Sequence, residues 1–171
     1  METWDAVTAR RNVRDYSDKE IPDAVLERIL EAGRRAPSAS NTQPWAFVLV
    51  KGRGRLEELS KVWQGAGHIA RSNATIAVTT PSPENERRGQ LNQFDLGQAT
   101  MAMMIVAADA GVGSGHSAVG DQDMARRLLG LPDNEICAYL IALGYPADRP
   151  LTPLKRPNRR PLEEVVHRDR W

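Results

Sequence analysis

The chain is poor in cysteine and aromatic residues and has no long apolar run. Cys137 is the only cysteine among 171 residues, so a disulfide within the chain and a cysteine-rich metal site are both excluded. Because Cys137 lies in the apolar run 136–141, we predict a small buried side chain and not a nucleophile. The nearly uncharged stretch 95–110 is shorter than the roughly 20 residues that span a bilayer, so we predict a buried helix there.

The chain also lacks a charge excess. Lys plus Arg number 23 and Asp plus Glu 22, so the net charge of +1 gives no reason to expect nucleic acid or a membrane surface as a partner. Residues 1–5 have neither the cationic start nor the apolar core of a signal peptide. We therefore expect a soluble, cytoplasmic protein.

Motifs of hydrolases and nucleotide-binding loops are missing as well. There is no Gly-x-Ser-x-Gly run and no glycine loop ending in Gly-Lys-Ser/Thr. The three histidines, His68, His116 and His167, lack metal-ligand spacing, so we predict surface or capping positions for them and no metal site.

Periodicity and turn residues predict one domain over residues 1–171, without internal repeats. Residues 84–93 are polar and either mobile or helical, and residues 150–171 form an extended C-terminal arm, because four of the 11 prolines lie in 150–161. The predicted helices are 3–8, 22–36, 55–63, 95–110 and 121–129, and the predicted strands are 45–50, 74–80 and 137–143.

One run, Pro-Ser-Ala-Ser-Asn-Thr-Gln-Pro-Trp at residues 37–45, is free of charge and bounded by prolines that stop regular structure. We call it the polar loop. Its neutral amides and hydroxyls suit a flat heterocycle with carbonyls and ring nitrogens. A plain helix-to-strand turn, with Trp45 packed into the core, is the alternative.

Two basic clusters are candidate phosphate sites. Residues 10–14, here called the arginine segment, hold Arg10, Arg11 and Arg14, and Arg159-Arg160 stand in the tail. Guanidinium groups bind phosphate in a bidentate manner, but solvated basic turns have the same composition. The glycine loop 111–115 offers backbone amides to a ligand, although it lacks the spacing of a dinucleotide fingerprint.

Taken in order, these pieces resemble the nitroreductase family of FMN-dependent oxidoreductases, over nearly the whole chain. The polar loop is the most specific part of the resemblance. The runs that carry it are Arg-Arg-Asn-Val-Arg at 10–14, the polar loop at 37–45, Gly-Val-Gly-Ser-Gly at 111–115, Ala-Leu-Gly-Tyr-Pro at 142–146 and Arg-Arg-Pro-Leu-Glu-Glu-Val-Val at 159–166.

The resemblance implies an α+β fold, with a central, mostly antiparallel sheet flanked by helices, in an intertwined homodimer with FMN at the subunit interface. Arg14 would lie near the N1/O2 edge of the flavin, and the polar loop would come from the partner subunit. The implied FMN contacts are Arg10, Arg11 and Asn12 to phosphate and ribityl, Pro37, Ser38, Ala39, Asn41 and Gln43 in the polar loop, Ser117, Ala118 and Val119 near N5, and Arg159 and Arg160 to phosphate.

The implied activity is ping-pong hydride transfer from NAD(P)H through FMN N5 to a nitroaromatic, quinone or enone, with no catalytic side chain named. Alternatives are a specialised flavin dehydrogenase or dehalogenase, a non-catalytic FMN carrier or redox sensor, and a basic-tailed interaction module without flavin. Compared with the family, residues 80–95 are short, position 12 is Asn in place of the common Ser, and His116 and Ser117 replace bulkier apolar residues.

Overall fold

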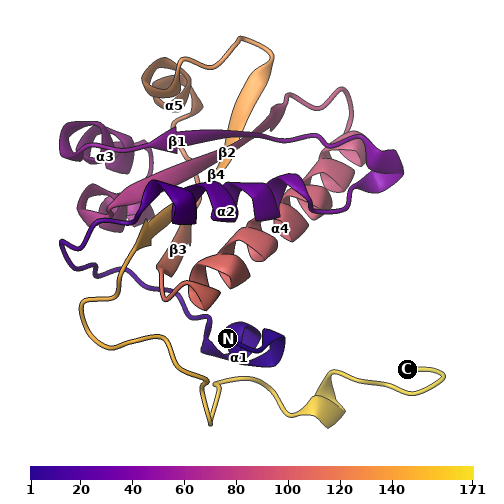
Figure 1. Cartoon of the computed structure of the whole chain (residues 1–171). Helices are drawn as coiled ribbons and strands as arrows, with labels where there is room; N and C mark the ends of the chain where they lie inside the picture. Colours follow the sequence, from indigo (N-terminus) through magenta and orange to yellow (C-terminus); the bar gives the residue numbers. More distant parts are fainter.

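A four-stranded antiparallel sheet forms the centre of the computed structural model, which describes residues 1–171 (Figure 1). Its strand order is β1-β2-β4-β3. Ile76 pairs with Ile141 in the long β2–β4 ladder, which has a bulge between Val78 and Thr79. The strands are β1 (Ala46–Val50), β2 (Ala74–Pro81), β3 (Gly113–Ser117) and β4 (Glu135–Gly144).

Helices cover both faces of the sheet. On one face α2 (Asp23–Arg34) lies beside α4 (Glu86–Asp109), and their core includes Ile76 and Ile141. On the other face α3 (Arg53–Leu59), two 3₁₀ segments at Ser60–Val62 and Gln64–Arg71, and α5 (Gln122–Leu129) share a core with Ala77 and Leu140. Neighbouring strand residues thus point to opposite cores, as the period of two requires. The expected α+β fold with an antiparallel sheet is confirmed.

Helix α4 is one continuous element of 24 residues, longer than the predicted 95–110. The helical alternative for 84–93 is therefore the correct one from Glu86 onward. Asn85 caps the helix, since its Oδ1 accepts the N–H of Arg88 at 2.9 Å. Met103 and Met104 are buried as expected, but Met101 faces outward with 39% of its surface exposed.

Two further predictions differ from the structure in informative ways. Residues 111–115 do not form a free glycine loop, because β3 begins at Gly113 and pairs with β4 from Gly144 inward. The predicted helix 55–63 is α3 followed by a 3₁₀ turn. Cys137 is fully buried, as predicted, and burial raises the pKa of its thiol to about 12.

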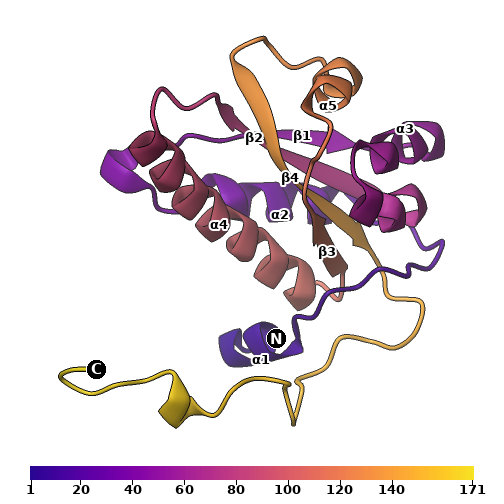
Figure 2. The same ribbon diagram turned by 180° about the vertical axis from the view of Figure 1, so that it is seen from behind.

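The last residues run outside the sheet. After β4 the chain passes α1 (Thr3–Ala9), where the N–H of Leu154 donates to the carbonyl of Thr8 at 3.1 Å. Figures 1 and 2 both show residues beyond this point extending away from the body, with a single 3₁₀ turn at Leu162–Glu164. Trp171 at the end is 98% exposed. No helix combines the length and the apolarity needed to cross a bilayer.

Candidate functional site

The arginine segment lies directly across edge strand β3. Asn12 forms a parallel bridge with Ser114, and the N–H of Val13 donates to the Ser114 carbonyl at 2.9 Å. A Cβ at Gly115 would lie 2.4 Å from the Val13 carbonyl oxygen, and one at Gly113 would meet the Val13 side chain at 2.6 Å. The absence of a side chain at these two glycines therefore allows the arginine segment to pack closely against β3.

The three arginines of this segment differ in their partners. Arg11 Nη2 donates to Asp148 Oδ1 at 2.6 Å and to the Arg149 carbonyl at 3.0 Å, which ties the segment to the start of the C-terminal arm. Arg10 and Arg14 form no ion pair. The Nε of Arg10 is buried without an acceptor, and Arg14 is exposed. Two guanidinium groups thus lack counter-charges on the protein.

Two buried polar side chains, Tyr16 and His68, contact the backbone where the arginine segment meets β3. Tyr16 Oη donates to the Val13 carbonyl at 2.7 Å, and His68 Nε2 lies 3.3 Å from the Gly115 carbonyl. Burial raises the pKa of the Tyr16 phenol and lowers the pKa of the His68 imidazole. The surface prediction is correct for His116 and His167 but wrong for His68, which is buried between the 3₁₀ segment and β3.

The turn after β3 holds the residues expected near the flavin N5. Ser117 is buried and its hydroxyl donates to the Ala118 carbonyl at 3.0 Å. The backbone N–H groups of Ala118 and Val119 donate to no protein acceptor, whereas the next amide, that of Gly120, donates to the Val62 carbonyl at 3.0 Å. The turn therefore presents two adjacent free donors.

The polar loop has an unusual backbone. Ser40, Asn41 and Gln43 have φ values of 51°, 55° and 50°, in the left-handed region that few side chains adopt. The N–H of Ala39 donates to both carboxylate oxygens of Asp95, each at 3.1 Å, and the N–H of Gln43 donates to Ser38 Oγ at 2.9 Å. Clusters of such backbone outliers are typical of functional sites.

The polar loop also connects α2 to β1, as expected for the alternative of a helix-to-strand turn. Trp45 is half-buried against the core between α2 and α4. The sequence missed Asp95 as a partner of this loop. Its only signal was a carboxylate at the start of the nearly uncharged stretch 95–110.

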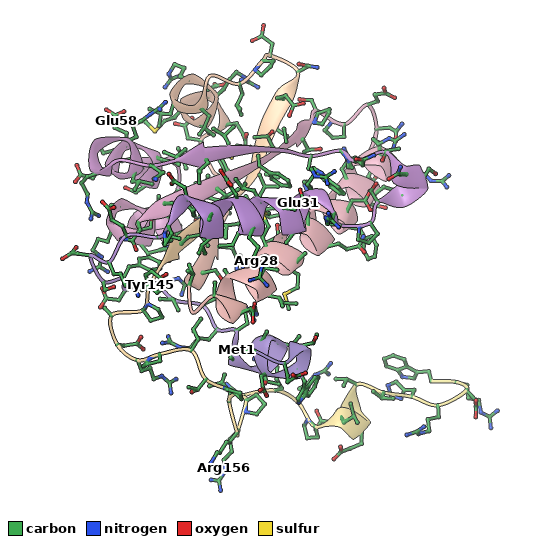
Figure 3. All side chains as sticks on the ribbon, in the orientation of Figure 1. Met1, Arg28, Glu31, Glu58, Tyr145 and Arg156 are labelled. Carbon is green, nitrogen blue, oxygen red and sulfur yellow. The ribbon has the colours of Figure 1, made fainter.

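Within one chain the two polar clusters do not meet. The polar loop contacts α4 at Asp95, whereas the arginine segment bridges to Ser114 of β3, and no hydrogen bond or ion pair joins the two. Met1 and Arg28, labelled in Figure 3, both pair with Asp109 at the end of α4. Asp95 lies 14 residues before Asp109, the last residue of α4, which is about 21 Å along the helix. No hydrogen bond or ion pair joins Arg159 or Arg160 to the arginine segment.

The architecture is that of an α+β protein with an antiparallel sheet between helical layers, and comparison with known proteins identifies the family. The nitroreductase family model matches residues 7–79 and 55–145. A protein of Archaeoglobus fulgidus, named as a candidate NADH dehydrogenase/NAD(P)H nitroreductase, is 30% identical over 96% of each chain. The chain belongs to the nitroreductase family.

Further relatives agree with this assignment. The NADH dehydrogenase of Thermus thermophilus is 29% identical over 95% of each chain. The solved structure of the NADPH:FMN oxidoreductase of Vibrio harveyi, in complex with NAD⁺, has a TM-score of 0.84 at 21% identity, covering 97% of this chain and 76% of that one. This likeness extends over both helical layers and the sheet.

Proposed function

We propose that the protein is an FMN-dependent oxidoreductase that uses NAD(P)H. Family membership supports an NAD(P)H-dependent oxidoreductase, and the names of the Archaeoglobus, Thermus and Vibrio proteins support the donor and the flavin. The observation that carries the proposal is that two kinds of unsatisfied donor lie beside edge strand β3. Arg10 and Arg14 have no counter-charge, and the backbone amides of Ala118 and Val119 have no acceptor.

The residues present fit FMN. The unpartnered Nε of Arg10 and the unpaired guanidinium of Arg14 suit an anionic phosphate and an electron-rich ring edge. The amides of Ala118 and Val119 suit the ring acceptors. Bound FMN would supply hydride transfer in a ping-pong cycle, from NAD(P)H to a nitroaromatic, quinone or enone acceptor.

Each group of side chains has a distinct role in this proposal. Arg14 places positive charge near N1/O2, where negative charge develops. Arg10 and Asn12 hold phosphate and ribityl oxygens, and Arg11 reaches the same phosphate or steadies the segment through Asp148. No side chain is required as an acid or base in the first half-reaction, the hydride transfer from NAD(P)H. The remaining contacts are Pro37, Ser38, Ala39, Asn41 and Gln43 from the polar loop, Ser117 after β3, and Arg159 and Arg160 on the arm.

A homodimer is part of the proposal. A two-fold axis across α4 would bring the polar loop of one subunit to the arginine segment of the other, so that the two parts would meet across the interface. Phe94 and Met101 lie a helical repeat apart on the outer face of α4 with 68% and 39% of their surfaces exposed. Between them, no heavy atom lies within 4 Å of a Cβ built on Gly97, so a partner helix could approach closely.

The test is flavin binding followed by turnover. We expect purified protein to bind FMN, to sediment at twice the 18.9 kDa chain mass, and to oxidise NADH or NADPH with a quinone acceptor. Arg14→Ala should weaken FMN binding about tenfold or more without loss of thermal stability, since Arg14 is exposed and unpaired. Arg127→Ala on α5 is the matched control, since Arg127 is also exposed and forms no ion pair.

The result that would overturn the proposal is equally direct. A colourless preparation that takes up no FMN would rule out every flavin-dependent function. A yellow protein that oxidises neither nicotinamide would retain FMN binding but contradict the proposed donor.

A further inference from the structure

Asp95 is a buried carboxylate without a cation. Only 1% of its surface is exposed, and it lies on α4 beside the buried Leu96 and Ala99. No Lys, Arg or His forms an ion pair with it. Burying a carboxylate is costly unless hydrogen bonds replace the lost water, so its partners show what it stabilises.

All hydrogen-bond partners of Asp95 belong to the polar loop or connect to it. The Ala39 N–H is shared between the two carboxylate oxygens at 3.1 Å each. The Gln98 side-chain amide lies 3.5 Å from Asp95 Oδ1 and 3.5 Å from the Pro37 carbonyl oxygen, which joins the carboxylate to the loop a second time.

These two contacts are the hydrogen bonds that tie the loop to α4. Ser40, Asn41 and Gln43 are exposed and adopt left-handed backbone conformations, which are unfavourable for residues other than glycine. Inside the loop, the Asn41 N–H donates to the Ser38 carbonyl at 3.0 Å and the Thr42 N–H to the Ala39 carbonyl at 3.1 Å, which shapes the turn. The position of this turn on the body depends on Ala39. Asp95 sets that position from a rigid helix.

We propose that Asp95 is a positioning residue that holds the polar loop in its flavin-binding conformation. The inference rests on the proposed function, in which this loop contacts FMN. Asp95 touches no ligand itself and acts through the Ala39 amide. The adjacent Phe94 lies on the outer face of the same helix, so one element both presents the dimer surface and orients the loop that serves the partner's flavin.

The first experiment measures the Kd of FMN by fluorescence quenching, with sedimentation to verify the dimer. We expect Asp95→Ala to raise the Kd about tenfold, and Asp95→Asn, which keeps one weaker acceptor for the Ala39 N–H, to raise it about threefold. Val106→Ala, on the same helix but packed against the core far from the loop, should lower the melting temperature and leave the Kd unchanged. Wild-type affinity in both Asp95 variants would overturn the inference.

The second experiment does not require flavin. Hydrogen exchange of the Ala39 amide in the FMN-free protein should be faster in Asp95→Asn than in wild type, and unchanged in Val106→Ala. Equal protection in wild type and Asp95→Asn would overturn the anchor even if FMN affinity fell. If wild-type protein takes up no FMN, the proposed function and the flavin role of Asp95 both fail, whereas faster exchange would still establish that Asp95 holds the loop.

Discussion

The arginine segment and the polar loop supply the two halves of the candidate site and are held in opposite ways. The segment is pinned to β3 by a backbone bridge and by the buried side chains of Val13 and Tyr16. The loop has no buried residue of its own and depends on one carboxylate. The arginine segment is thus attached to the core through Val13 and Tyr16, whereas the neutral polar loop can be altered without unfolding the protein.

Gly115→Ala should have the largest effect, because it breaks the arginine segment's contact with the sheet. A Cβ there would lie 2.4 Å from the Val13 carbonyl oxygen, a backbone atom that cannot rotate away. We expect a loss of about 2–4 kcal/mol in the free energy of unfolding, measured by urea denaturation. Gly54→Ala, with no atom within 4 Å, should change stability by less than about 1 kcal/mol. Equal stability of the two variants would contradict the close-approach role of Gly115.

Asn41 tests the loop with a smaller effect. Asn41→Ala should cost about 1 kcal/mol of stability, because alanine disfavours a φ of 55°. Asn41→Gly keeps this backbone conformation and should cost less. Both variants lack the side-chain amide, so we expect both to bind FMN about tenfold more weakly in a fluorescence titration. Wild-type affinity in Asn41→Gly would show that only the backbone matters at this position.

The Arg11–Asp148 contact should give the smallest change, confined to the C-terminal arm. Arg11 holds the pKa of Asp148 below its usual range, so the contact persists above that range and is lost as the pH falls through the folded-state value. We expect the protection factor of the Leu154 amide to fall in acid in wild type and to be low at every pH in Asp148→Asn, by hydrogen exchange. Glu163→Gln, farther along the arm and without a partner, is the control. A protection factor of the Leu154 amide that does not vary with pH in wild type would contradict the claim that this ion pair holds the arm in place.

Much of the fold follows from local sequence. Apolar periodicity located α2, β2, α5 and β4 to within a few residues, because one-sided or continuous burial leaves a direct trace in residue type. Strand β3 was missed since Gly-Ser-Gly-His-Ser has neither β-branched residues nor alternation. Its strand conformation comes from pairing with β4 and from the segment packed over it.

The candidate site, like the fold, was predicted in part from the sequence. Residue type made the arginines and the charge-free loop candidates, and the order of the runs along the chain, through the family resemblance, selected them over plain turns. Sequence could not show that Arg11 pairs with Asp148, that His68 is buried under β3, or that Asp95 anchors Ala39. Each of these contacts joins residues more than 40 positions apart.

The sequence by itself determined the family, the buried apolar elements and the absence of disulfides, because these depend on which residues are present and in what order. Only the tertiary structure decided that the glycines at 113 and 115 are packing positions, and that no hydrogen bond or ion pair joins the two halves of the site within one chain. The physical reason is that close approach and separation are properties of the folded backbone, to which distant parts of the chain contribute jointly.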